Sequence, residues 1–271
     1  MLCRIAQASR SGYYKWLRSK GKNKDQADYL LIKEIFEQGK SKLGWRPVQM
    51  RLKEDYGVVM NHKKIKRIMR ENNLAVKIRK KNPYKMIMKK TQEHRTFENI
   101  LDRNFRRDIP GQALCTDITY LYYGLGRKAY LSAVKDIATK EILGWKVSSN
   151  LALKFVLDSV ASLKDIETIG EKTIIHSDQG FHYTSPEYIA KVKKLGLTQS
   201  MSRKGNCIDN APIESFFGHL KDDIDCGQAK TFEELNGIID EYMDYYNNRR
   251  YQWELKKMTP VEYRNHLLKS L

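Results

Sequence analysis

The sequence predicts an α/β domain with a mixed five-stranded sheet flanked by helices, preceded by an all-α region that resembles a helix-turn-helix. Two observations support this division. Patterns typical of strands begin only after Ala113 and then alternate with helical patterns, whereas the chain before that point contains only helical patterns. With 271 residues, the chain is also long enough for more than one folding unit.

The charge of the chain is divided in the same way. The formal net charge is +18. Residues 1–95 contain 26 basic residues (Lys and Arg) and 8 acidic residues (Asp and Glu). Residues 96–271 contain 24 basic and 24 acidic residues. An excess of this size on one region favours a polyanionic partner such as DNA over the alternative of an ordinary soluble basic surface.

The helical region is expected to contain four segments. The first has a possible break at Ser11-Gly12, Gly57 is expected to end the third, and Asn61 is expected to cap the fourth. Pro47 is tolerated because it falls in the first turn of its helix. The segments cover residues 3–20, 25–38, 47–56 and 63–72.

The fourth segment has one apolar face and one cationic face. Ile65, Ile68 and Met69 share the apolar face. The opposite face carries Lys63, Lys66, Arg67 and Arg70. Such a helix can pack on a neighbouring helix while its cations contact DNA phosphates, as in a helix-turn-helix. The alternative is a solvated basic surface on a small helical bundle.

A sheet domain follows a basic linker. Three strands in a meander, a crossover helix and two further strands separated by a helix predict a mixed sheet. The strands are expected at residues 114–123, 129–137, 142–148, 172–175 and 197–200, and the helices at 151–166, 185–195, from 211, at 232–247 and after 260. The predicted boundaries are 1–76 for the helical region, 77–110 for the linker and 111–271 for the sheet domain.

Three acids stand at positions that suit a metal site. Asp117 lies within a predicted strand, Asp178 follows a strand end, and Glu214 lies near the start of a helix whose cap is Asp209 or Asn210. Hard divalent cations prefer carboxylate oxygens, and two such ions can catalyse phosphodiester cleavage. His176 is either a further ligand or, more simply, a structural residue at the strand end.

Lys221 lies seven residues after Glu214, on the same side of the helix. There it could hold a DNA phosphate beside the metal ions, although a solvated lysine is the alternative.

The sequence motifs around these acids resemble those of a known family, the DDE transposases of bacterial insertion sequences. The resemblance is to the type encoded by the second reading frame (OrfB), which is related to retroviral integrases. The resemblance covers almost the whole chain. It rests on Thr116-Asp117-Ile118-Thr119-Tyr120, His176-Ser177-Asp178-Gln179-Gly180, Gly205-Asn206-Cys207, Asp209-Asn210-Ala211, Glu214-Ser215-Phe216-Phe217, Leu220-Lys221 and Thr259-Pro260. The family usually has Trp upstream of the first acid, where this chain has Leu114.

The resemblance implies a ribonuclease-H-like integrase core that carries out metal-dependent strand cleavage and strand transfer on DNA. It implies that Asp117, Asp178 and Glu214 are both the catalytic residues and the ligands of Mg²⁺ or Mn²⁺, with two ions expected. The partners implied are double-stranded DNA, as element ends and target, further copies of the chain, and a first-frame (OrfA) protein.

Two other functions remain open on the sequence. One is a catalytically silent DNA-binding regulator, or a partial transposase that lacks its first-frame partner. The other is a nuclease of the same fold that cuts without joining. Four cysteines without CxxC spacing and the absence of a long apolar run predict a cytoplasmic, nucleoid-associated protein without a membrane span.

Overall fold

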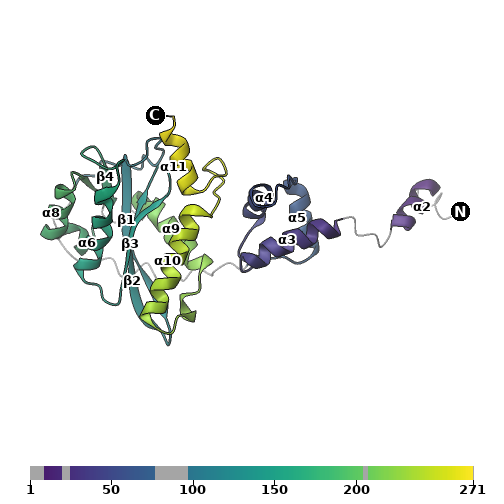
Figure 1. Cartoon of the computed structure of the whole chain (residues 1–271), viewed down its shortest axis with the longest axis horizontal. Helices are drawn as coiled ribbons and strands as arrows, with labels where there is room; N and C mark the ends of the chain where they lie inside the picture. The colour runs from purple at the N-terminus through teal and green to yellow at the C-terminus, as the bar shows by residue number, and fades with distance from the viewer. Residues whose placement is uncertain (1–8, 20–24, 77–96, 204–206, 271) are drawn as a thin grey trace. The chain divides into compact units, whose positions relative to one another are not determined.

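The computed structural model describes residues 9–19, 25–76, 97–203 and 207–270. It divides the chain into two units, Met1–Lys77 and Ile78–Leu271. The first unit contains α2 (Arg10–Ser19), α3 (Gln26–Gln38), α4 (Trp45–Glu54) and α5 (His62–Glu71) (Figure 1).

Helices α3, α4 and α5 share one apolar core. Its fully buried members come from all three helices: Ile32, Ile35, Val48, Leu52, Ile65 and Ile68. The predicted helix ends are confirmed, since the side chain of Asn61 accepts a hydrogen bond from the N–H of Lys63 and Gly57 adopts a φ of +67° after α4. The break predicted at Ser11-Gly12 is wrong, because Ser9 Oγ accepts the N–H of Gly12 at 2.9 Å in the first turn of α2.

The second unit is built on one five-stranded sheet. β1 (Ala113–Tyr123), β2 (Arg127–Asp136) and β3 (Ile142–Ser148) form an antiparallel meander. β4 (Ile174–Ser177) runs parallel to β1, and β5 (Thr198–Met201) runs parallel to β4. The strand order is β3-β2-β1-β4-β5. The predicted mixed sheet is confirmed.

Helices cover both faces of this sheet. The helical elements are α6 (Leu153–Ala161), η2 (Ser162–Asp165), α7 (Phe181–Thr184), α8 (Pro186–Lys194), η3 (Cys207–Asn210), α9 (Ala211–Asp223), η4 (Cys226–Gln228), α10 (Phe232–Asn248) and α11 (Pro260–Leu268). Figure 1 shows the sheet nearly edge-on, with α6 and α8 on one side and α9 and α10 on the other. Each side encloses its own apolar core.

Residues before the sheet also pack on this unit. Leu101 is buried in the core beneath α9 and α10, where Phe105 packs against it, and Phe97 packs against the core of α6 and α8. The described part of the predicted linker, from residue 97 to 110, therefore lies against the sheet unit. Its first part, residues 77–96, lies outside the described residues.

The first helix after the meander ends earlier than the apolar pattern predicts. α6 stops at Ala161 and continues as the 3₁₀ helix η2. Ser162 Oγ donates a hydrogen bond to the carbonyl of Ser159 at 2.8 Å, and such local bonding by serine competes with the α-helical pattern. Among the described residues, no helix is both long enough and apolar enough to span a membrane.

Candidate active site

The register of the two central strands places Asp117 beside Asp178. Cys115 of β1 pairs with His176 of β4 in parallel register, and the two acids come two residues later on each chain. Because side chains alternate along a strand, Asp117 lies on the same face of β1 as Cys115, which is the face that α9 covers. Asp178 directly follows the carboxyl end of β4, where open α/β sheets place functional groups.

Backbone groups and a buried phenol define the surroundings of both acids. The N–H of Ile118 donates to Asp117 Oδ1 at 2.8 Å, and the N–H of Gly180 donates to Asp178 Oδ1 at 2.8 Å. Burial raises the pKa of Tyr183 well above its usual value, and the charges of Asp117 and Asp178 raise it further. The two carboxylates therefore act on the same buried side chain.

Helix α9 lies along β1 next to these acids. Ile213, Phe216, Phe217 and Leu220 form its buried face. At its start, Asn210 Nδ2 donates to the carbonyl of Thr116 at 3.2 Å, directly before Asp117. At its other end, the Lys221 ammonium donates to the hydroxyl of Thr119, two residues after Asp117. The helix is thus attached to β1 on both sides of this acid.

Glu214 lies in the first turn of α9 and is exposed. It shares one side of the helix with Lys221, whose ammonium reaches β1, so this side of α9 borders the strand of Asp117. Within the described part of the chain, however, no three His, Cys, Asp or Glu side chains are grouped closely enough to hold a metal ion. The strand register brings Asp117 and Asp178 to neighbouring strands, but the three acids do not form a metal-binding cluster in the described structure.

The donor set nevertheless fits a hard divalent cation. One carboxylate within β1, a second directly after β4 and a third on the helix beside them supply the oxygen ligands that Mg²⁺ and Mn²⁺ prefer. Binding requires the three carboxylates to come closer together than they do here. The exposed Glu214 side chain can change its rotamer without disturbing the core, because the apolar face of α9 is formed by other residues.

His176 is a structural residue and not a ligand in this arrangement. It is fully buried, and its two ring nitrogens are hydrogen-bonded to Ser200 Oγ at 2.9 Å and to Ser202 Oγ at 3.1 Å. Burial lowers the pKa of His176 to about 4, so the ring is neutral at pH 7. This resolves the alternatives left open by the sequence and links the end of β4 to β5.

Asp209 has a role that the sequence does not predict. Asn210 is the N-cap residue of α9, although its side chain makes no capping hydrogen bond, and Asp209 is fully buried in front of it. The Asp209 carboxylate accepts hydrogen bonds from Arg103 Nε at 2.6 Å, Arg203 Nε at 3.1 Å and Asn99 Nδ2 at 3.0 Å. The bonds from Arg203, followed by those from Arg103, hold the pKa of Asp209 well below its usual value.

Lys135 is a second residue whose role the sequence does not reveal. It lies on β2 with 5% of its surface exposed, and its ammonium donates to the carbonyl of Pro212 at 3.0 Å. This bond holds the first turn of α9, which carries Glu214, against the sheet. The signal in the sequence is a lysine that follows the largely apolar run of residues 129–134 within a predicted strand.

Comparison with known proteins identifies the family. Residues 22–82 match the model of an HTH-like domain, and residues 107–207 and 214–268 match two models of an integrase core domain. The chain is 34% identical, over 97% of its length and 92% of the other protein, to InsK of insertion sequence element IS150 from Escherichia coli K12. It is 27% identical, over 97% of its length and 93% of the other, to the transposase InsF of insertion sequence IS3A from the same organism.

The chain belongs to the family of insertion-sequence transposases. Among solved structures, the catalytic core domain of HTLV-2 integrase in complex with magnesium matches 58% of this chain and 97% of that chain, with 12% identity and a TM-score of 0.45. The resemblance inferred from the sequence motifs is confirmed by the relatives, and the predicted integrase core is confirmed by the family models.

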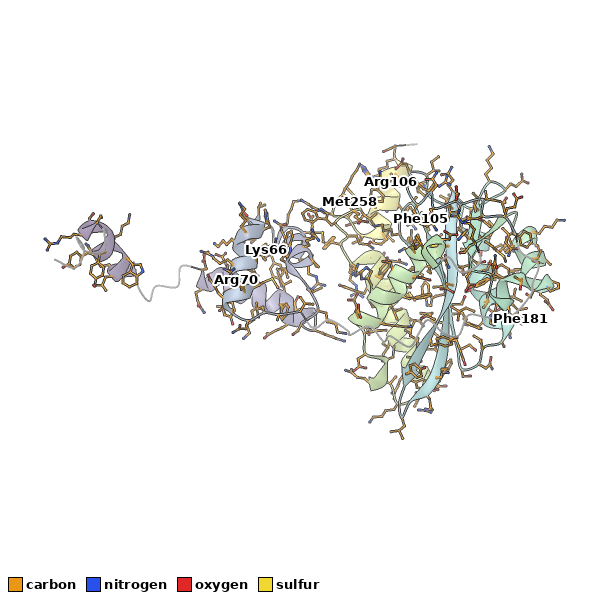
Figure 2. The ribbon with its side chains drawn as sticks, turned by 180° about the vertical axis from the view of Figure 1, so that it is seen from behind. Lys66, Arg70, Phe105, Arg106, Phe181 and Met258 are labelled. Carbon is orange, nitrogen blue, oxygen red and sulfur yellow. The ribbon has the colours of Figure 1, made fainter. Side chains whose placement is uncertain are left out.

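The four cations predicted to bind DNA in this transposase all lie exposed on α5, within the HTH-like domain. Figure 2 labels two of them, Lys66 and Arg70. Lys66 lies over the Trp45 ring at 4.4 Å from its centroid, and Arg67 pairs with Asp25 at 2.5 Å. For Lys63 and Arg70 no ion pair is found within residues 25–76. Two of the four cations therefore have protein partners.

Proposed function

We propose that this transposase cuts DNA at the ends of its insertion element and joins those ends to target DNA, with Asp117, Asp178 and Glu214 as its catalytic residues. The observation that carries the proposal is the parallel register of β1 and β4, which sets Asp117 beside Asp178 on the face of the sheet that α9 covers. Membership of the transposase family supplies DNA as the substrate.

The three carboxylates would hold Mg²⁺ or Mn²⁺, in two ions, and these ions supply Lewis-acid stabilisation of the phosphate and a deprotonated nucleophile when bound. The protein contributes the placement of the ligands. Backbone N–H groups of Ile118 and Gly180 orient the two aspartates, and the packed face of α9 fixes the helix that carries Glu214. Lys221, which is attached to Thr119, lies where it can contact a DNA phosphate.

The chemistry consists of two displacements at phosphorus. In cleavage, a water oxygen bonds to phosphorus while the bond to the 3′ oxygen breaks, and the products are a 3′-hydroxyl and a 5′-phosphate. In transfer, that 3′ oxygen loses its proton and bonds to a phosphorus of the target strand, whose own 3′ oxygen leaves and takes up a proton. No external energy source is needed, because one phosphodiester is exchanged for another.

DNA recognition is assigned to the HTH-like unit. We place Lys63, Lys66, Arg67 and Arg70 of α5 at the DNA, with Lys63 and Arg70 as the principal phosphate contacts because the other two already have protein partners. The proposed partners are double-stranded element ends and target DNA, further copies of the chain bound to the same DNA, and a first-frame protein. The cytoplasm, in association with the nucleoid, is the proposed location.

A cleavage and strand-transfer assay tests this function. The substrate is a duplex carrying the element's own ends, incubated with a target duplex and Mg²⁺ or Mn²⁺. The wild type is compared with Asp117→Asn, Asp178→Asn and Glu214→Gln, and with the matched controls Asp158→Asn and Glu241→Gln, which change exposed acids of α6 and α10. We expect joined product from the wild type and both controls and none from the three active-site variants.

Other results distinguish the remaining functions. Cleavage retained by any one active-site variant would refute the assignment of that acid. Cleaved but never joined DNA would identify a nuclease of the same fold. DNA binding without any product, even after the first-frame protein is added, would identify a regulator.

A further inference from the structure

The hairpin formed by β1 and β2 has two faces of different character. On one face Leu121, Tyr123, Ala129 and Leu131 are buried in the core that α10 helps to enclose. Figure 1 shows the hairpin extending beyond the end of α6, whereas α10 runs beside it on the other side. The contact of α6 with β2 is marked by the hydrogen bond between Ser159 and Ser132 at 2.8 Å, farther up the strand. On the outer face below this point, Tyr130 still packs in part against the core of α6 and α8, whereas Tyr120, Tyr122 and Lys128 are exposed.

Aromatic rings and a cation occupy this outer face. We name its members the tyrosine ridge: Tyr120, Tyr122, Lys128 and Tyr130. The strand register pairs Tyr120 with Tyr130 and Tyr122 with Lys128, so all four side chains lie on one face. Tyr120 is 44% exposed and Tyr122 is 57% exposed. The solvent face of a sheet is ordinarily polar, and a contiguous exposed apolar patch indicates a binding surface.

The geometry of the ridge suits nucleobases. The Tyr120 and Tyr130 rings meet edge to face with centroids 5.7 Å apart. The Lys128 ammonium lies 5.5 Å from the centroid of Tyr120 and 6.0 Å from that of Tyr122. Exposed aromatic rings on which bases stack, beside cations that contact phosphates, are the features by which proteins bind single-stranded nucleic acid.

The ridge and the proposed active site share strand β1 but lie on opposite faces of the sheet. Asp117 lies on the face of Leu121 and Tyr123, which α9 and α10 cover, whereas Tyr120 and Tyr122 lie on the other face. The ridge is therefore a surface separate from the acids.

We propose that the tyrosine ridge binds unpaired bases of a DNA strand by stacking, with Lys128 contacting the phosphates. Paired bases inside a duplex hide their faces in the stack, so the ligand is single-stranded DNA. A second copy of the chain is a poorer occupant. Isologous packing of this face around a two-fold axis would bring two copies of Lys128 onto the same patch, where their charges repel. The binding itself does not depend on the three acids.

Binding of a fluorescein-labelled oligothymidine strand to the full chain, measured by anisotropy, tests the proposal. Raised salt weakens the phosphate contacts of the basic helical unit more than it weakens stacking. Under these conditions we expect Tyr120→Leu/Tyr122→Leu to bind at least about twenty-five-fold more weakly, since each of the two stacked rings contributes at least about fivefold. Tyr120→Phe/Tyr122→Phe keeps both rings and should bind like the wild type.

The control is Tyr13→Leu/Tyr14→Leu on α2, where the two rings are 44% and 48% exposed. The proposal would be overturned if Tyr13→Leu/Tyr14→Leu and Tyr120→Leu/Tyr122→Leu lost equal affinity for the oligonucleotide. It would also be overturned if the affinity of Tyr120→Leu/Tyr122→Leu were unchanged. The proposal would also be overturned if sedimentation showed that the wild type is a dimer and the ridge variant a monomer, because the ridge would then be an interface between copies of the chain. The assay measures binding and includes no cleavage step, so its outcome is separate from failure of the proposed catalysis.

A second measurement uses the unaltered protein, in case the leucine variant does not fold. Wild-type protein is photo-crosslinked to a strand that carries 5-iodouracil, and the modified peptides are mapped by mass spectrometry. Adducts on Tyr120, Tyr122 or Tyr130 are expected. Adducts confined to other segments of the chain would refute the assignment.

Discussion

Replacing Asp209 by Asn should destabilise the sheet unit, because this buried carboxylate holds together segments that are far apart in the sequence. It accepts hydrogen bonds from Arg103, Arg203 and Asn99. An amide of the same shape can keep part of this arrangement but removes the charge that the two guanidinium groups pair with. A hydrogen bond to a charged group contributes about 1.5–3 kcal/mol, and disrupting a buried ion pair costs about 3–5 kcal/mol.

The partners reduce the expected effect. The side chains of Arg103 and Arg203 are 40% and 49% exposed, so both can turn to water in the variant. We therefore expect a loss of about 2–3 kcal/mol in the free energy of unfolding. For a unit of this size, that corresponds to a fall in Tm of about 5–10 °C. Calorimetry of the sheet-unit transition at neutral pH measures this directly.

The control and the pH dependence sharpen the test. Asp102 is 73% exposed and pairs with Arg203 at 3.3 Å, so Asp102→Asn should change Tm by less than about 2 °C. Because the pKa of folded Asp209 is depressed, its stabilisation is present above the unfolded value of about 3.9 and is lost as pH falls toward the folded value. The difference between wild type and Asp209→Asn should therefore shrink below about pH 4. Equal Tm values at neutral pH would refute the reasoning.

Two further predictions concern the sheet unit and the helical unit. Gly144→Ala should lower the free energy of unfolding by about 1–3 kcal/mol, because the new Cβ would lie 2.3 Å from the carbonyl oxygen of Ser159. The control is Gly218→Ala on α9, whose new Cβ meets nothing within 4 Å and which should be neutral or stabilising. Chemical denaturation of both variants measures the difference. Lys63→Gln/Arg70→Gln should weaken duplex binding and reduce the slope of log affinity against log salt concentration by about 2. Fluorescence anisotropy over a salt series measures this slope. An unchanged slope would show that α5 is not part of the DNA interface.

The elements of the fold could be predicted from sequence because their signals are local. Asn61 caps α5, Gly57 follows α4 with a positive φ, and the strands of the meander follow the pattern of β-forming residues. The predicted helix boundaries were wrong at two places where a serine side chain forms a local hydrogen bond with the backbone. Ser9 accepts the N–H of Gly12 and so preserves a helix where a break was predicted, and Ser162 ends α6 early.

The assembly of the site could be predicted only in part. The positions of Asp117 and Asp178 relative to strands were visible, but their pairing depends on the parallel register between β1 and β4, which no local pattern specifies. The partners of His176 lie in β5 and directly after it, and two of the three partners of Asp209, Asn99 and Arg103, come from a segment more than a hundred residues earlier in the chain. Such long-range contacts are set by packing, so the sequence left the role of His176 open and did not reveal that of Asp209.

Titration of the protein with Mn²⁺, followed by electron paramagnetic resonance, tests most directly whether the three acids form one metal site. The wild type and the control Glu241→Gln should bind Mn²⁺ equally, and Asp117→Asn, Asp178→Asn and Glu214→Gln should each bind at least about tenfold more weakly, because each removes a carboxylate ligand. Wild-type affinity in Glu214→Gln would contradict the account, since it would leave the ion on the two aspartates without the acid of α9.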